Sequence, residues 1–433
     1  MINKPYVLIL IVGALLFLDA FLVYRYLSWG SAMDEILPFT GFLLLAETIT
    51  VFSIIRFNQI INPFTLYSLF IYITGFSFLI ISDRQIDYDY HYILIIVLSI
   101  AFFIAGGLVA MKTFTFSFKS YLPPLSQRLS LAFLLLVFVA GIGVFILEVG
   151  QLGYLPVFNL ANAEVYQELN ENEVTPLHNF IIVNSVLPAM FYILFKRKTL
   201  RFWQFLLLTA VCGFIILNFF SRQIIVLFFF SMLIAYSYYK TIPLLKFFSI
   251  GVLCTVIFIV LGQLRGGSSE ESNSMSVNDF LRDYGDITKP TNIIETYLSL
   301  YGAVNLTSGN GIVSDALRDD YVSYGLYSAR PVLTIIPVDK NAIYPPLYSS
   351  YTKLGTYLVD PFLDFRWIGV IGLNFMYGLF AMNSFKNYLA KNGEYYIVEW
   401  SLFIFCIFMC AFTNFFHMFF VAFFFIINRI AIK

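Results

Sequence analysis

Charged residues are scarce in this chain, and their scarcity excludes an ordinary soluble domain. Only 12% of the 433 residues are Asp, Glu, Lys or Arg, which is about half the share found in a typical globular protein. Hydrophobic residues make up 60% of the chain, aromatic residues make up 19%, and the mean hydropathy is +0.82. This composition predicts an all-α polytopic membrane protein.

Histidine and cysteine are also rare, which argues against metal and disulfide chemistry. The chain has three histidines, His91, His178 and His417, and it contains no HExxH motif, no phosphate-binding P-loop and no dinucleotide-binding glycine motif. The cysteines lie inside apolar runs, where they act as small packing residues: Cys212, Cys254, Cys406 and Cys410. We therefore expect no metal centre, no disulfide framework and no bound cofactor.

About twelve apolar runs are long enough to cross the bilayer core, which takes roughly 20 residues of helix. They lie near residues 6–27, 37–55, 63–82, 92–111, 129–149, 179–195, 202–220, 223–239, 246–263, 367–385, 398–414 and 415–430. The last two runs meet at Asn414–His417, so the chain has either 12 spans or 11 with one kinked element. The first run follows Lys4 and lacks a small-residue cleavage site, while Asp19 interrupts it; this favours a retained signal anchor over a cleaved signal peptide.

The longest break in hydrophobicity lies between the ninth and tenth predicted spans. It divides one integral membrane domain into spans one to nine (1–263), a long loop (264–365) and spans ten to twelve (366–433). Within the loop, apolar residues at helical spacing predict two short amphipathic helices, Thr291–Tyr301 and Ser314–Tyr324. We expect these helices to lie flat on the bilayer.

Positive charge is segregated between alternating connections. When the N-terminus is placed in the cytoplasm and the chain crosses twelve times, 15 of the 26 Lys and Arg residues fall inside, against two acids, Glu394 and Glu399. Outer connections are acidic, as in the stretch 150–176, which has glutamates and no cation. This positive-inside pattern predicts cytoplasmic termini and a long loop that faces outward.

Arginines at the outer boundary are candidates for binding an anionic head group, because a guanidinium grips phosphate bidentately and stays charged. Arg222 stands in a short outer turn between two spans, and Arg265 ends the ninth span beside two glycines. Arg282, Arg318 and Arg330 are further candidates within the loop. Alternatively, Arg222 and Arg265 anchor helix ends at the lipid interface, and the loop arginines are solvated.

Carboxylates and one histidine near the outer boundary are candidate bases for a hydroxyl nucleophile. Asp360 and Asp364 lie in "VDPFLDFRWIG", and His178 stands at the outer start of the sixth span. The alternatives are that Asp364 pairs with Arg366 or caps the following helix, and that His178 is structural. Further candidates are Glu148, Asp87 and Asp89.

The layout resembles the Wzy-type oligosaccharide repeat-unit polymerases, which include the O-antigen polymerases. The resemblance rests on Arg222 at the start of the span "SRQIIVLFFFSMLIAYSYYK", on Arg265 in "GQLRGG" and on the long outer loop. It extends over about residues 200–390, whereas the first five spans match only in hydropathy.

The end of the loop, "YTKLGTYLVDPFLDFRWIGVIGLNFMYGL", completes the resemblance. Proteins of this kind have a threonine, an Asp-Phe-Gly and then a glycine that enters a span. Thr352, Asp364 and Gly369 fit these positions, but Arg366 stands where the glycine of Asp-Phe-Gly is expected.

The resemblance implies a GT-C-type glycosyltransferase of the bacterial inner membrane. Such an enzyme moves a growing glycan from one undecaprenyl diphosphate onto another carrier-linked repeat unit, with inversion at the anomeric carbon. Its expected partners are the lipid-linked donor and acceptor, the membrane lipids, and the chain-length co-polymerase and flippase of the same pathway, not nucleic acid. We expect Arg222 and Arg265 to stabilise the leaving diphosphate and name Asp364 first as the base.

Two other functions stay open. A glycan ligase shares the donor and the fold type but passes the chain to the lipid A core. A flippase or secondary transporter is also compatible with twelve spans, although the sequence shows no two-fold hydropathy repeat.

Overall fold

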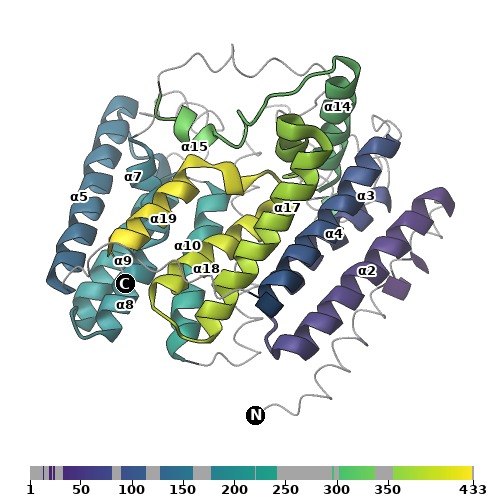
Figure 1. The fold of residues 1–433 in the computed structure, drawn as a ribbon. Helices are drawn as coiled ribbons and strands as arrows, with labels where there is room; N and C mark the ends of the chain where they lie inside the picture. Colours follow the sequence, from purple (N-terminus) through teal and green to yellow (C-terminus); the bar gives the residue numbers. More distant parts are fainter. Residues whose placement is uncertain are drawn as a thin grey trace.

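The computed structural model describes residues 33–79, 89–113, 127–158, 177–219, 221–240, 302–336 and 355–431, with a few single positions in 13–24 and at 295–296. Every regular element in these ranges is helical (Figure 1). The α-helices are α2 (Met33–Phe57), α3 (Pro63–Leu79), α4 (Tyr90–Thr113), α5 (Gln127–Leu152), α7 (Asn179–Ile182), α8 (Leu187–Lys196), α9 (Phe202–Asn218), α10 (Arg222–Tyr239), α14 (Val304–Arg318), α15 (Arg330–Leu333), α17 (Val359–Leu389), α18 (Tyr395–Phe408) and α19 (Phe419–Ala431). The 3-10 turns are η1 (Pro156–Phe158), η2 (Val183–Ser185), η5 (Met409–Ala411) and η6 (Phe415–His417).

Five of the described helices are long and apolar enough to cross a membrane, or six when the bent pair formed by α7 with η2 and α8 is counted as one span. The shorter apolar helices α3, α9, α18 and α19 coincide with four more of the predicted spans. The predicted span 246–263 and most of 6–27 lie outside the described residues. The described part of the chain is thus all-helical, as in a multi-pass membrane protein, whereas the total of twelve spans stays a prediction.

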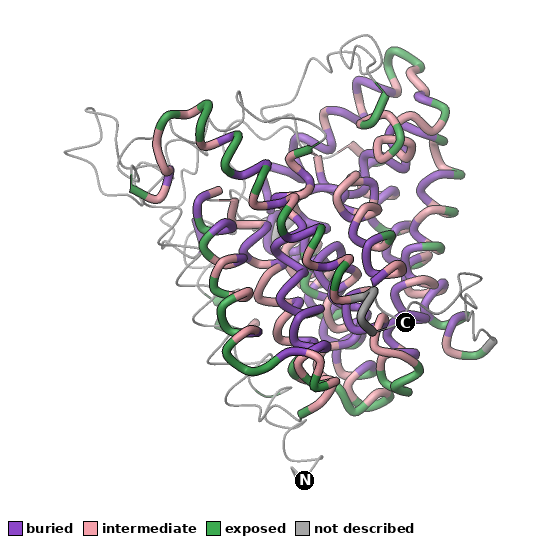
Figure 2. The backbone as a smooth tube through the Cα atoms, turned by 90° about the vertical axis from the view of Figure 1, so that its left-hand side faces the viewer, coloured by how far each residue is buried: buried purple, intermediate pink, exposed green. Residues whose placement is uncertain are grey.

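Apolar side chains cover the outer faces of the bundle. On α5, four such side chains are each more than half exposed: Leu136, Val139, Ile146 and Leu147. Figure 2 shows that exposed residues line the outward faces of the helices, while buried residues lie toward the centre. An apolar exterior of this kind suits contact with lipid chains.

Glycines bring α4 and α17 into backbone contact at the centre of the bundle. A Cβ atom at Gly378 of α17 would lie 1.9 Å from the carbonyl oxygen of Phe103, and one at Gly106 of α4 would lie 2.0 Å from that of Phe375. Only glycine permits so close an approach, which is a common way of packing helices in membranes. This contact fixes the position of α17, the helix that begins near the candidate site.

The chain reverses direction between α18 and α19. The Arg429 guanidinium near the end of α19 stacks 4.2 Å from the ring of Tyr395 at the start of α18, and Asn428 Nδ2 donates to the Tyr395 carbonyl at 2.8 Å. The two helices are therefore antiparallel, with the reversal at 409–418. The alternative of one kinked element at this place is wrong, because a kinked helix could not bring its two ends together.

Connections predicted to share the inner side lie at the same end of the bundle. Arg197, after α8, pairs through Nε with Glu394 Oε2 at 2.5 Å, and the Tyr239 hydroxyl at the end of α10 donates to the same carboxylate. Lys386 Nζ, near the end of α17, donates to the Ala110 carbonyl near the end of α4 at 2.7 Å. The structure therefore places at one end of the bundle the connections that the charge pattern assigns to one side. Which end faces the cytoplasm stays a prediction.

The described loop helix differs from the prediction in both position and burial. The predicted helix Ser314–Tyr324 is wrong, because α14 ends at Arg318 and Asp320 takes a positive φ of 47°. α14 also packs against α4, where a Cβ at Gly309 would stand 2.4 Å from the Tyr92 hydroxyl. Its small polar residues have low helix propensity, but their size lets the helix approach its neighbour. Only residues 295 and 296 of the other predicted loop helix are described.

Candidate functional site

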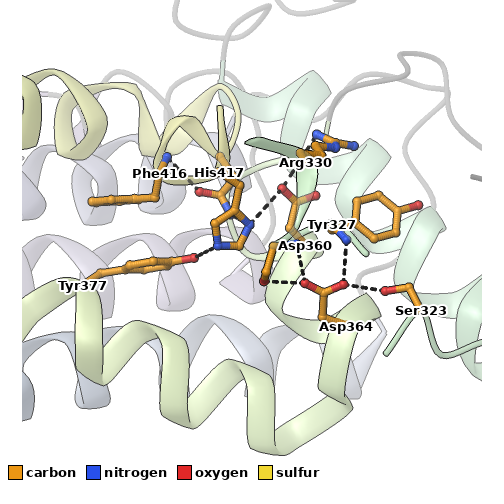
Figure 3. Close-up of polar contacts among 10 residues, drawn as sticks. Ser323, Tyr327, Arg330, Asp360, Asp364, Tyr377, Phe416 and His417 are labelled. Carbon is orange, nitrogen blue, oxygen red and sulfur yellow. Dashed lines mark hydrogen bonds and ion pairs between the residues drawn. The ribbon is translucent and has the colours of Figure 1, made fainter. Parts of the chain in front are cut away.

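Three segments that are far apart in the sequence bring Arg330, Asp360 and His417 together (Figure 3). Asp360 lies in the first turn of α17, His417 ends η6 in the α18–α19 reversal, and Arg330 begins α15. The Asp360 Oδ2 atom lies 3.7 Å from His417 Nδ1 and 3.9 Å from Arg330 Nη1. We call these three residues the Asp360 cluster; it joins two predicted site residues to a histidine that had no predicted role.

The Asp360 carboxylate is buried, with 7% of the residue exposed. Its Oδ2 atom has no hydrogen-bond donor among the described residues, although the two basic side chains lie within 4 Å. Burying a carboxylate oxygen costs free energy unless basic groups or hydrogen-bond donors lie close to it. The Oδ2 atom thus lies between two basic side chains.

The His417 ring is held on both of its nitrogens. Its Nε2 atom is hydrogen-bonded to the Tyr377 hydroxyl, and its Nδ1 atom lies 3.1 Å from Asn414 Nδ2. The ring of Tyr377 in turn stacks on Phe416 at 4.2 Å. Sequence reasoning missed this network; its one sequence signal is the polar pair Asn414 and His417 within an otherwise apolar run.

Asp364, the first base named from the sequence, fixes a turn of the chain. Its Oδ1 atom accepts hydrogen bonds from Ser323 Oγ at 2.5 Å and Tyr327 N at 2.9 Å. Its Oδ2 atom accepts from the Ser328 backbone N at 2.7 Å and from Ser328 Oγ at 2.5 Å. Because these donors occupy both oxygens and the residue is fully buried, Asp364 shapes the segment that leads to Arg330, whose guanidinium stacks 4.9 Å from the Tyr327 ring.

A kink in α17 separates the turn that carries Asp360 from the membrane helix. Phe365 and Arg366 leave the helical conformation, and Arg366 has φ 53° and ψ −137°. After the kink, a Cβ at Gly369 would lie 1.9 Å from the Pro361 carbonyl oxygen, so only glycine fits there. Arg366, at the position where the resemblance calls for glycine, therefore has a backbone conformation that favours glycine.

The Arg366 side chain donates to the Ala316 carbonyl at 2.9 Å and pairs with Asp320 at 3.3 Å.

Glycine at position 366 should be better tolerated than alanine. Both substitutions remove the guanidinium contacts, but alanine keeps a Cβ in a backbone region where it is strained. We expect Arg366→Gly to be more stable than Arg366→Ala by about 1–2 kcal/mol. Thermal unfolding of the two purified variants in one detergent measures the difference, and equal stabilities would contradict the assignment of strain.

The third candidate base, His178, lies in a separate pair. Its Nδ1 atom is 3.0 Å from Glu148 Oε2 and 3.1 Å from Oε1, and Glu148 is buried in α5. The ring of Phe219 meets the His178 ring edge-on at 4.9 Å. Phe219 precedes the first turn of α10, which begins at Arg222. Two sequence candidates, His178 and Glu148, are therefore in direct contact, and Phe219, three residues before Arg222 in the chain, packs beside them.

The remaining candidate arginines lie elsewhere. Arg318 is on the surface at the end of α14, where Nη2 pairs with Asp315 at 2.9 Å and Nε with Asp319 at 3.1 Å. The Asp319 carboxylate, followed by that of Asp315, raises the pKa of this guanidinium. Arg265 and Arg282 lie outside the described residues, so their diphosphate-binding role stays a prediction.

Asp89 caps the N-terminus of α4. Its Oδ1 atom accepts hydrogen bonds from the His91 backbone N and from His91 Nδ1, both at 2.9 Å, and its Oδ2 accepts from Ser314 Oγ at 3.4 Å. The His91 backbone hydrogen bond, followed by the side-chain bond, lowers the Asp89 pKa below 3.8. Asp89 thus links α4 to α14, while its sequence neighbour Asp87 lies outside the described residues.

Asp89→Asn should cost stability in a pH-dependent way. Because the pKa of Asp89 is lowered on folding, its charge stabilises the fold above about pH 3.8 and this contribution is lost as the pH falls through the folded value. We expect the variant to be less stable than the wild type by up to about 1 kcal/mol at pH 7, with the gap closing below pH 3.8. Thermal unfolding of the wild type and the variant at pH 7 and at pH 3 measures this difference in stability. A difference that grows in acid would contradict the capping role of Asp89.

Comparisons with known proteins identify no match for the chain. No family model, no curated protein and no solved structure matches it. Among the described residues, no three His, Cys, Asp or Glu side chains lie together as ligands of a metal ion would. The chemistry of the site is therefore argued from its own side chains.

Proposed function

We propose that this protein polymerises undecaprenyl-diphosphate-linked oligosaccharide repeat units at the outer face of a bacterial inner membrane. The observation that supports this most is the buried Asp360 carboxylate, whose Oδ2 atom lies between Arg330 and His417 and has no hydrogen-bond donor among the described residues. Asp360 begins α17, and Glu394, in the connection assigned to the cytoplasm by charge, follows the other end of that helix. Lipid-linked sugars arrive pre-activated, so the reaction on the outer side needs no nucleotide.

In the proposed reaction Asp360 is the general base. The acceptor hydroxyl gives its proton to Oδ2, and its oxygen forms a bond with the anomeric carbon of the donor glycan from the face opposite the diphosphate. The bond between that carbon and the diphosphate oxygen breaks, its electron pair leaves with the diphosphate, and the anomeric configuration is inverted. This assignment moves the base from Asp364, whose oxygens are occupied.

Arginines would stabilise the charge that develops on the leaving diphosphate. Arg330 stands beside the base with 31% of its side chain exposed, and the sequence adds Arg222 and Arg265 at the same predicted depth. A fixed cation or donor in a site of low dielectric contributes about 3 kcal/mol to such a transition state. The arginines therefore supply the electrostatic stabilisation that the leaving group needs.

Deleting the gene in its own bacterium tests the proposal. We expect the surface glycan to lose its ladder of chain lengths and to retain a single repeat unit on its final lipid acceptor. Wild-type protein supplied from a plasmid should restore the ladder, and Asp360→Asn should not. An unchanged ladder in the deletion strain would overturn the proposal.

Two other phenotypes would replace the polymerase with a different function. Long chains that accumulate on undecaprenyl diphosphate without reaching the lipid A core would indicate a ligase. Single repeat units that stay on the carrier at the inner leaflet would indicate a flippase. Gel analysis of the glycan, with and without mild acid release from the carrier, separates these results.

A further inference from the structure

We infer that Asp360 and His417 act as one proton acceptor, in which the proton taken from the incoming hydroxyl is shared between Asp360 Oδ2 and His417 Nδ1. This inference rests on the proposed function for its place in a reaction, although its structural part stands without it. His417 lies 57 residues from Asp360 along the chain, and the α18–α19 reversal brings the two together.

The orientation of the Asn414 side chain determines which ring nitrogen of His417 carries hydrogen. The Phe416 backbone N donates to Asn414 Oδ1 at 3.2 Å, so the amide nitrogen Nδ2 faces His417 Nδ1 at 3.1 Å. An amide nitrogen only donates, and Nδ1 must therefore be the unprotonated, accepting nitrogen. In the neutral ring the hydrogen is then on Nε2, where it is donated to the Tyr377 hydroxyl.

This tautomer leaves two acceptors facing each other. Asp360 Oδ2 has no hydrogen-bond donor among the described residues, and the nearest His417 atom, Nδ1 at 3.7 Å, already accepts from Asn414. A proton delivered to Oδ2 turns the carboxyl group into a donor, and Nδ1 is the acceptor within reach once its single lone pair is released by the Asn414 amide. A hydrogen bond between these atoms needs the gap to shorten by about 1 Å.

The charges around the pair suit a proton that is taken up and then released. Arg330 of α15 faces Oδ2 from the other side at 3.9 Å, Tyr377 of α17 faces the far ring nitrogen, and the Asp364 carboxylate is occupied by its own donors. Sharing the proton therefore spreads the added positive charge over two groups.

Nitrogen NMR of histidine gives a direct test, because the chain has only three histidines. Protein labelled with 15N-histidine is placed in nanodiscs, and His91→Gln and His178→Gln assign the spectra by elimination. We expect His417 in the wild type at neutral pH to show a protonated Nε2 and an unprotonated Nδ1. In Asn414→Ala the Nδ1-protonated form should appear as well, because that nitrogen can then donate to Asp360. In Asp360→Asn the His417 Nδ1 resonance should move, while the resonances of the other histidines stay unchanged.

A double-mutant cycle tests the shared proton in the reaction. The assay uses wild-type and variant proteins in nanodiscs, with the lipid-linked single repeat unit extracted from the deletion strain as the probe. We expect His417→Gln to lower polymer formation by at least 10-fold. The double variant, Asp360→Asn with His417→Gln, should be no slower than Asp360→Asn alone, because the effects of groups that act as a unit do not add.

His91→Gln is the control and should keep the wild-type rate. Tyr377→Phe, which keeps the ring but removes the hydroxyl partner of Nε2, should retain the fold and slow the reaction less than His417→Gln.

The outcomes separate the inference from the proposed function. A protonated Nδ1 in the wild type, or losses in the double variant that multiply, would overturn the shared acceptor even if the protein is a polymerase. An unchanged glycan ladder in the deletion strain would overturn the polymerase, while the expected tautomer would still support the pairing of Asp360 with His417.

Discussion

Asp360→Asn is expected to lower polymer formation by about 10²- to 10⁴-fold, the usual effect of losing a general base. The amide is nearly the same size as the carboxylate, and the Oδ2 atom has no described hydrogen bond to lose. The fold should therefore persist, because the change alters only the contacts with His417 and Arg330 at 3.7 and 3.9 Å. The rate of chain growth in nanodiscs and the thermal unfolding of the same preparation measure the two effects separately.

Asp364→Asn is the matched control for this variant. It lies one helical turn further along α17, but its oxygens hold Ser323, Tyr327 and Ser328. An amide can accept at only one of its two positions, so we expect a loss of stability of about 1–3 kcal/mol. Should Asp364→Asn abolish polymer at full stability while Asp360→Asn stays active, the base would be Asp364 after all.

Gly378→Ala is expected to destabilise the protein by more than about 3 kcal/mol, the upper end of the range for overpacking. The new methyl group would stand 1.9 Å from the backbone oxygen of Phe103, which cannot turn away as a flexible side chain would. α4 and α17 would have to separate, and the first turn of α17, with Asp360, would move with them. The amount of monodisperse protein after detergent extraction and its midpoint of thermal unfolding measure this effect.

Gly372→Ala provides the control on the same helix. No atom lies within 4 Å of a Cβ at this exposed position, and alanine favours a helix over glycine by about 1 kcal/mol. We therefore expect Gly372→Ala to be neutral or slightly stabilising. If both variants lose stability equally, the close approach of α4 and α17 is not what holds α17 in place.

Sequence patterns predicted the membrane helices well, because hydrophobic length is a local property of the chain. The predicted spans 37–55, 92–111 and 129–149 lie within α2, α4 and α5. The predicted start of the tenth span at 367 falls directly after the kink at Phe365 and Arg366. The sixth span was predicted as one apolar run, 179–195, and within it α7–η2 and α8 meet at a bend of 50°, which no hydropathy signal marks.

The site was predicted only in part, because its geometry depends on contacts between distant segments. Asp360 and Arg330 were among the candidates for their charge and position, and the structure places them in one cluster. Asp364 was ranked above Asp360, because the sequence does not show that the Ser323–Ser328 turn folds over it. His417 was passed over, because a lone histidine in an apolar run gains a neighbour such as Asp360 only when α18 and α19 fold back.

The short hairpin that carries His417 has a consequence for how substrates arrive. α18 and α19 contain 14 and 13 residues, so each helix rises about 20 Å at 1.5 Å per residue. Under the proposed function, a substrate on a long lipid tail would reach His417 at this reversal by lateral diffusion in the bilayer. The rate of turnover would then follow the number of carrier lipids per area of membrane.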